Sequence, residues 1–198
     1  MTPELSIERN AIFSGMNPRM TLGNVAVISE RLMYRRPQAL DLQRLFDLYS
    51  DPRTQRFNPA GPFKTLTQAK ALLETWIEHW DREGYGWWAI AEQHAPEHII
   101  GFGGVALHDY QGTLRPNIGY RLAVDAWGKG YATELGRVAL RWAFGTPGIP
   151  RVWAFVRPET AASIKVLEKL GLQRCGVLDD VPSERPSLLF EISKDQVC

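Results

Sequence analysis

The sequence has only two cysteines, Cys175 and Cys198, and its formal net charge is only +1 over 198 residues. Two cysteines, one of them the last residue, provide neither a disulfide framework nor a metal site. Lysine and arginine are spread along the chain, which excludes the basic patch that general binding to nucleic acid or an anionic membrane requires. The composition therefore predicts no nucleic-acid partner and no membrane partner.

Long apolar runs are also missing. None approaches the roughly 18 residues of a membrane-spanning helix, and polar residues occupy the N-terminus where a signal peptide has its apolar region. We therefore expect a cytoplasmic protein. The histidines show no metal-ligand spacing with acidic or thiol side chains, so each is expected to be a surface or structural residue and no metal is expected; they are His79, His94, His98 and His108.

What the sequence does contain is an ordinary globular composition, with 44% hydrophobic and 23% charged residues. This length and composition suffice for one substantial core. Residues 1–24 contain prolines, glycines and asparagines with little periodicity, which predicts an N-terminal extension. Residues 25–198 are then expected to form a single domain.

Hydrophobic periodicity predicts alternating strands and helices over this domain. Proline and glycine residues mark the expected boundaries of these elements, and Thr65 or Thr67 is expected to cap the second helix. Strands are expected over 27–35, 87–92, 99–107, 117–124, 151–156, 172–178 and 187–192, with helices after Pro37, over 69–80, after the glycine-rich turn at 127–133, and over 160–170.

The most informative segment is that turn, residues 127–133, which read Trp-Gly-Lys-Gly-Tyr-Ala-Thr between a strand-like and a helical run. The first amides of a helix lack acceptors within it, and the helix dipole adds positive charge, so a diphosphate can bind there. Gly128 and Gly130 permit a sharp turn and a close approach. A dinucleotide-binding fingerprint would need glycine where Thr133 stands, and a P-loop would need serine or threonine where Gly130 stands. Taken alone, the turn is equally compatible with an ordinary loop.

Several further motifs stand at a consistent spacing around this turn. The chain has Arg-Leu-Met-Tyr-Arg at 31–35, Ile-Ile-Gly-Phe-Gly-Gly at 99–104, Ile-Gly-Tyr at 118–120, Glu134 after the turn, and Ser163 followed by Glu-Lys-Leu-Gly-Leu at 168–172. Together they resemble the GNAT superfamily of acetyl-CoA-dependent N-acetyltransferases, in the branch that includes the ribosomal-protein N-terminal (alanine/serine) acetyltransferases. The resemblance covers residues from about 27 to 193.

The resemblance implies an α/β (α+β) fold of the GNAT-like acyl-CoA N-acyltransferase type. Its central sheet is mixed and mostly antiparallel, with about seven strands flanked by about four helices. The implied co-substrate is acetyl-CoA, with an amine acceptor as the second partner, and both a monomer and a homodimer remain open.

By the same resemblance, the main chain of the glycine-rich turn holds the CoA pyrophosphate. The strand before the turn binds the pantetheine arm, and one of its amides polarises the thioester carbonyl. Lys165 and Lys169 reach the outer phosphate, although a solvated helix face explains them equally well. Thr160 stands where many relatives have an asparagine. The implied residues are Leu122, Ala123 and Val124 for pantetheine, and Trp127, Gly128, Lys129, Gly130, Tyr131, Ala132 and Thr133 for pyrophosphate.

The family chemistry is direct attack of a neutral amine on the thioester, without an acyl-enzyme. Ser163 is the candidate donor to the departing thiolate, or else a local helix cap. Asn117 stands where many members carry the glutamate base. His108 and Asp109 are therefore the substitute candidates for the base, or ordinary loop residues. Glu134 is expected to pair with Arg137 instead.

The acceptor is expected to be a primary amine, either a protein N-terminus or a small molecule such as an amino acid, polyamine or antibiotic. Aromatic residues provide either an apolar acceptor groove or core packing. The alternative function is a non-catalytic acyl-CoA-binding regulatory domain, which the missing glutamate and asparagine permit. The aromatic residues in question are Trp76, Trp80, Tyr85, Trp87, Trp88, Phe102 and Tyr110.

Overall fold

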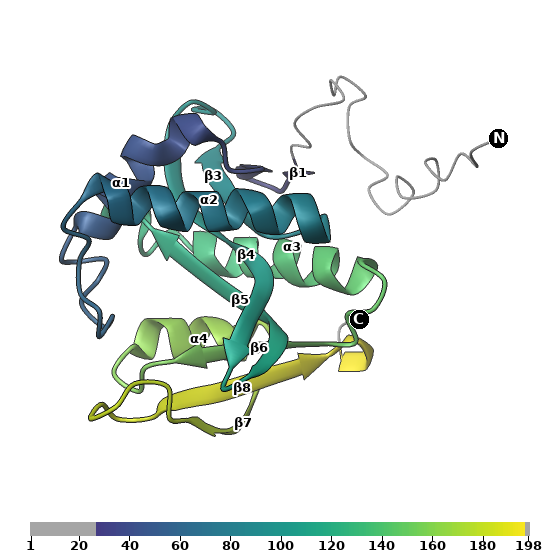
Figure 1. Ribbon diagram of the computed structural model, residues 1–198. Helices are drawn as coiled ribbons and strands as arrows, with labels where there is room; N and C mark the ends of the chain where they lie inside the picture. Colours follow the sequence, from purple (N-terminus) through teal and green to yellow (C-terminus); the bar gives the residue numbers. More distant parts are fainter. Residues whose placement is uncertain (1–26, 197–198) are drawn as a thin grey trace.

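The computed structural model describes residues 27–196, so the expected extension at 1–24 lies outside the described residues. Eight strands form one sheet in the order β1-β2-β3-β4-β5-β6-β8-β7. Every neighbouring pair is antiparallel except β5 and β6, which are parallel. The predicted mixed, mostly antiparallel sheet is confirmed (Figure 1).

The elements follow the predicted order. The strands are β1 Val27–Ile28, β2 Leu32–Arg35, β3 Trp87–Glu92, β4 Ile99–Tyr110, β5 Thr113–Leu122, β6 Arg151–Val156, β7 Gln173–Leu178 and β8 Ser187–Ser193. The α-helices are α1 Leu42–Ser50, α2 Leu66–Glu83, α3 Tyr131–Gly145 and α4 Ala161–Lys169. Within residues 27–196, no helix combines the length and apolarity needed to cross a membrane.

The single strand predicted over residues 27–35 is wrong, because the chain turns back there and forms the β1–β2 hairpin. Glu134 of α3 explains the turn, since its carboxylate accepts hydrogen bonds from Ser29 Oγ at 2.6 Å and from the amide of Arg31 at 2.8 Å. Because these contacts span about a hundred residues of sequence, the hydrophobic pattern used to predict strands cannot reveal them. The hairpin supplies the eighth strand.

The ends of α2 follow from its sequence. Thr65, rather than Thr67, is the N-cap, because its hydroxyl accepts the amide of Gln68 and the Gln68 side chain bonds back to Thr65. Gly84 ends the helix in the left-handed conformation, at φ 72°. Thr65 is one of the two caps that the sequence predicts, and the capping box and the glycine stop are common ways to begin and end a helix.

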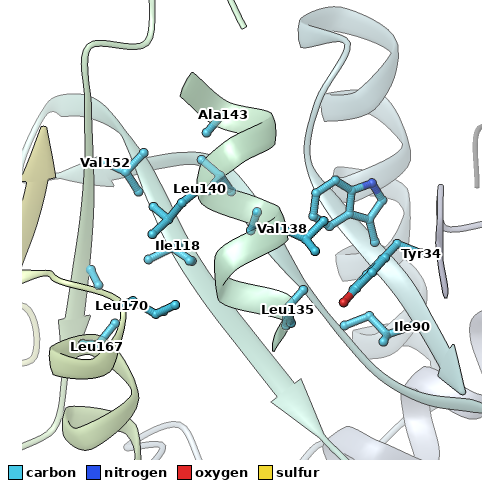
Figure 2. Packing of buried hydrophobic residues seen from close by; sticks show 14 of the residues in the cluster. Tyr34, Ile90, Ile118, Leu135, Val138, Leu140, Ala143, Val152, Leu167 and Leu170 are labelled. Atoms are coloured by element: carbon cyan, nitrogen blue, oxygen red, sulfur yellow. The ribbon is translucent and has the colours of Figure 1, made fainter. Parts of the chain in front are cut away.

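Helices cover both faces of the sheet, α1 and α2 on one and α3 and α4 on the other (Figure 1). Figure 2 shows the side chains of α3 directed at the strands beneath it, with α4 alongside. Leu135, Val138 and Leu140 of α3 share this core with Ile118 of β5 and Val152 of β6. Full burial of each such side chain contributes about 1.5–3 kcal/mol, so this packing fixes the start of α3 relative to β5 and β6.

His79 is a structural histidine, as predicted. Its Nδ1 lies 2.8 Å from the carbonyl oxygen of Tyr85, and its Nε2 accepts the amide of Leu107 at 3.0 Å. Burial lowers the pKa of His79, which favours the neutral ring that this arrangement requires. The side chain thus ties α2 to β4.

Candidate functional site

The glycine-rich turn adopts the geometry that its sequence predicts. Gly128 and Gly130 have φ values of 75° and 81°, and α3 begins at the next residue, Tyr131. No side chain caps this helix. The amides of Thr133 and Glu134 both donate to the carbonyl of Gly130, whereas the amides of Tyr131 and Ala132 precede the first helical hydrogen bonds. The helix start therefore offers donors to an anion.

Contacts from the β1–β2 hairpin hold this turn in place. Arg31 Nη1 donates to the carbonyl of Lys129 at 2.8 Å, and Arg31 Nε donates to Glu134 at 2.8 Å. The expected pairing of Glu134 with Arg137 is therefore wrong. Burial opposes ionisation of Glu134, but hydrogen bonds from Ser29 and Arg31 outweigh it and lower the pKa. A carboxylate bound in this way holds the turn in position.

A gap opens between β5 and β6 beside the turn. Only Asn117 of β5 and Trp153 of β6 are paired, although β5 continues to Leu122. The amide of Ala123 donates to the carbonyl of Ile100 at 2.8 Å. Because hydrogen bonds alternate along an antiparallel strand, the amide of Leu122 points to the other edge, toward β6. Beyond Asn117, this edge of β5 has no partner strand among the described residues.

The gap and the helix start belong to one cavity of about 720 Å³. Ligand sites typically measure about 300–1,000 Å³, so the cavity is large enough for an extended ligand. Its lining comes from the α1–α2 loop (Arg53, Thr54, Phe57, Asn58, Pro59), from β5 and the glycine-rich turn (Tyr120, Arg121, Leu122, Ala126, Trp127, Gly128, Gly130, Tyr131, Ala132, Thr133), from β6 and α4 (Phe155, Val156, Arg157, Thr160, Ala162, Ser163, Lys165, Val166, Lys169), and from Asp180, Val181 and Ser187 near β7 and β8.

Most of the residues assigned to CoA lie in this lining, and three do not. Ala123 commits its amide to Ile100, and Val124 starts a short 3-10 helix, Val124–Ala126. Lys129 directs its ammonium toward Glu92, with Nζ 3.7 Å from Oε1. The structure brings the remaining eleven together: Leu122, Trp127, Gly128, Gly130, Tyr131, Ala132, Thr133, Thr160, Ser163, Lys165 and Lys169.

Two hydroxyls meet where β5 faces α4. Tyr120 OH donates to Ser163 Oγ at 3.3 Å, and both residues line the cavity. Burial raises the pKa of Tyr120, so its hydroxyl stays protonated at neutral pH. The pair can therefore donate a hydrogen bond to an anion that forms in the cavity.

His108 and Asp109 lie outside the cavity lining. The ring of His108 packs on Phe155 with centroids 4.7 Å apart, and burial lowers its pKa. Asp109 Oδ1 accepts the amide of Gly112 at 2.6 Å and so shapes the turn between β4 and β5. Asn117 Oδ1 accepts Tyr110 OH at 2.6 Å. Neither candidate base is placed where it could contact a ligand in the cavity directly.

Asp180 is a cavity residue that the sequence does not reveal. Its Oδ2 accepts hydrogen bonds from Arg157 Nη2 at 3.1 Å and from Ser187 Oγ at 3.2 Å. Its Oδ1 is buried and has no hydrogen-bond partner among the described residues. Asp180 follows β7 in a proline-containing loop, and no motif in the sequence marks it as a site residue. Its pairing with residues distant in the sequence places it at the cavity. Among the described residues that line the cavity, it is the one with a carboxylate.

The aromatic acceptor groove is not formed. None of the seven aromatic residues considered for it lines the cavity. They pack together instead, as Trp76 does with Trp87 at 4.8 Å and with Phe102 at 5.5 Å between ring centroids. The alternative prediction, core packing, describes these residues.

Comparison with known proteins agrees with this geometry. Residues 31–173 match the family model of the acetyltransferase (GNAT) domain. A protein named uncharacterized N-acetyltransferase p20, from Bacillus licheniformis, is 31% identical over 162 residues, which cover 81% of this chain and 89% of that protein. The chain belongs to the GNAT family and is an acetyl-CoA-dependent acetyltransferase.

Solved structures share the fold. Ribosomal-protein-S5-alanine acetyltransferase from Vibrio fischeri has a TM-score of 0.70 at 19% identity, covering 88% of this chain and 99% of that one. Spermidine N-acetyltransferase from Vibrio cholerae, in complex with CoA and spermine, has a TM-score of 0.69 at 17% identity, covering 85% and 99%. The expected GNAT-like fold is confirmed.

Proposed function

We propose that this protein transfers the acetyl group of acetyl-CoA to a primary amine by direct attack within the cavity. One observation carries the proposal: the unpaired edge of β5 and the free amides at the start of α3 line the same cavity. A pantetheine arm and a pyrophosphate need these two kinds of surface, strand-like hydrogen-bonding groups and converging N–H donors.

In this proposal the pyrophosphate binds the main chain from Gly128 to Thr133, chiefly the amides of Tyr131 and Ala132. The pantetheine arm runs along β5 toward Leu122. The amide of Leu122 faces the gap and polarises the thioester carbonyl, where negative charge develops during attack. Lys165 and Lys169 on α4 reach toward the outer phosphate, and Thr160 lies beside the arm.

The amine nitrogen then attacks the carbonyl carbon, and the carbon–sulfur bond breaks. The departing thiolate accepts a hydrogen bond from the hydroxyl of Ser163, which in turn accepts one from Tyr120 OH. The attacking amine must lose a proton, and we assign its acceptor to Asp180, directly or through one water. Asp180 lines the cavity, whereas His108 lies behind Phe155 and outside the lining.

Thiol release from acetyl-CoA over a panel of amines tests this function. We expect release above the hydrolysis background with at least one class among amino acids, polyamines, aminoglycosides and peptides with free N-termini, and an acetylated product by mass spectrometry. Tight CoA binding without turnover on any of these amines would instead identify a non-catalytic acyl-CoA-binding domain.

A further inference from the structure

We propose that the acceptor amine carries a carboxylate and that Arg121 binds it. This inference rests on the proposed function and names the acceptor class for the same cavity. Tyr120 and Arg121 are successive residues of β5, so their side chains project to opposite faces of the sheet. Tyr120 reaches Ser163 on α4, whereas Arg121 reaches Tyr49 on α1. Arg121 therefore lies across the sheet from the helix that we assign to CoA.

The guanidinium of Arg121 is held in position without a counter-charge. Its Nη1 donates to the carbonyl of Thr54, and its Cζ lies 5.4 Å from the centre of the Tyr49 ring. Its Nε is buried without a hydrogen-bond partner, and no carboxylate among the described residues pairs with it. A partly buried cation without a counter-charge is stabilised by an anion, and a carboxylate can accept hydrogen bonds from the N–H groups of the guanidinium.

The other charges on this side of the cavity are already paired. Arg53 bonds Asp51 at 2.6 Å, and Arg157 bonds Asp180 at 3.1 Å. Arg121 therefore leaves an excess of positive charge where the acceptor enters. A polyamine would add further positive charge to this surface, which is unfavourable, whereas an anionic group on the acceptor complements it.

Two buried polar side-chain atoms of the described chain lack a partner, and both belong to cavity residues: Arg121 Nε and Asp180 Oδ1. One is a donor on β5, and the other is an acceptor beyond the gap, next to Arg157. A molecule with a carboxylate and an amine meets both residues, the carboxylate at the Arg121 guanidinium and the amine at Asp180. Both residues line the same cavity, so one ligand in that space can contact the guanidinium and the carboxylate together.

Matched acceptors that differ by one carboxylate test this directly with the wild-type protein. The pairs are L-phenylalanine and phenethylamine, L-leucine and isopentylamine, β-alanine and ethylamine, and γ-aminobutyrate and propylamine. In the pair that the protein accepts, we expect kcat/KM for the carboxylate-bearing amine to be about 10- to 100-fold higher than for its carboxylate-free partner. This is the gain that charge-assisted hydrogen bonds typically give. Equal or faster turnover of the carboxylate-free amines, of spermidine or of O-phosphoethanolamine would overturn the proposal.

Arg121→Gln separates binding of the carboxylate from a structural role. The variant should lose about 10- to 100-fold in kcat/KM for the preferred carboxylate acceptor, mainly through KM, and little for its carboxylate-free partner. Arg121→Lys should recover part of the loss. Arg115→Gln, on the same strand but outside the cavity lining, is the matched control and should resemble the wild type. An equal loss for both acceptors would assign Arg121 a structural role only.

If no amine is acetylated, the proposed function fails, and calorimetry can still test whether Arg121 binds a carboxylate. N-acetyl-L-phenylalanine, N-acetyl-L-leucine, N-acetyl-β-alanine and N-acetyl-γ-aminobutyrate would each be titrated into the CoA-bound protein and its Arg121→Gln variant. Binding that is lost in the variant would support the carboxylate site independently of catalysis. No binding to the wild type, or equal binding to both proteins, would overturn it.

Discussion

Ala132→Glu should weaken CoA binding by about 100- to 1,000-fold while leaving the fold intact. Ala132 is the second residue of α3 and lines the cavity at the assigned pyrophosphate site. At an effective dielectric constant of about 20, two like charges about 4 Å apart repel by about 4 kcal/mol, which accounts for the loss. A glutamate in the first turn complements the helix dipole, so the melting temperature should not fall.

Isothermal titration calorimetry with CoA at low salt measures this effect. Ala132→Gln adds nearly the same bulk without charge and is the matched control, so it should lose much less affinity. Raising the salt concentration should narrow the difference between the two variants, because salt screens the repulsion. Equal dissociation constants for the Glu and Gln variants would show that the pyrophosphate lies elsewhere.

Asp180→Asn should lower kcat by about 10²- to 10⁴-fold, the usual contribution of a positioned proton acceptor. Asparagine keeps an oxygen for Arg157 and Ser187, so the loop should stay in place, and the dissociation constant for CoA should be unchanged. The amide cannot take the proton of the attacking amine. Raising the pH, which deprotonates more of the amine in solution, should recover part of the lost rate.

Steady-state kinetics with the best acceptor of the panel makes this comparison. Asp179→Asn is the matched control, because Asp179 is the exposed neighbour of Asp180 and does not line the cavity. His108→Gln should likewise have a small effect. A large loss of kcat in His108→Gln together with full activity in Asp180→Asn would identify His108, which the sequence suggests, as the proton acceptor.

The geometry of the part of the cavity that we assign to CoA can be predicted from the sequence because its determinants are local. Gly128, Gly130 and the start of α3 lie within a few residues of one another, and a glycine-rich turn before a helix has few alternative structures. The edge of β5 follows from the same segment. Three residues differ from the expectation. Ala123 and Val124 lie beyond the strand, because β5 ends two residues earlier than expected and the amide of Ala123 joins the ladder to β4, and Lys129 turns toward Glu92.

The part of the cavity that we assign to the acceptor depends on contacts between distant segments, and these contacts cannot be inferred from the sequence. Asp180 reaches the cavity through Arg157, which is 23 residues away, and Arg121 is held by Thr54, which is 67 residues away. The pairing of Glu134 with Arg31 spans 103 residues. Residue type alone suggests His108, Asp109 and the aromatic residues instead, and the fold places these side chains in strands, turns and core.

A crystal structure of the protein with CoA bound tests the central claim most directly. We predict that the diphosphate oxygens lie within hydrogen-bond distance of the amides of Tyr131 and Ala132, and that the thiol lies in the gap between β5 and β6 near Leu122, Tyr120 and Ser163. CoA bound at another surface, or a pantetheine arm that does not enter this gap, would contradict the assignment of the cavity.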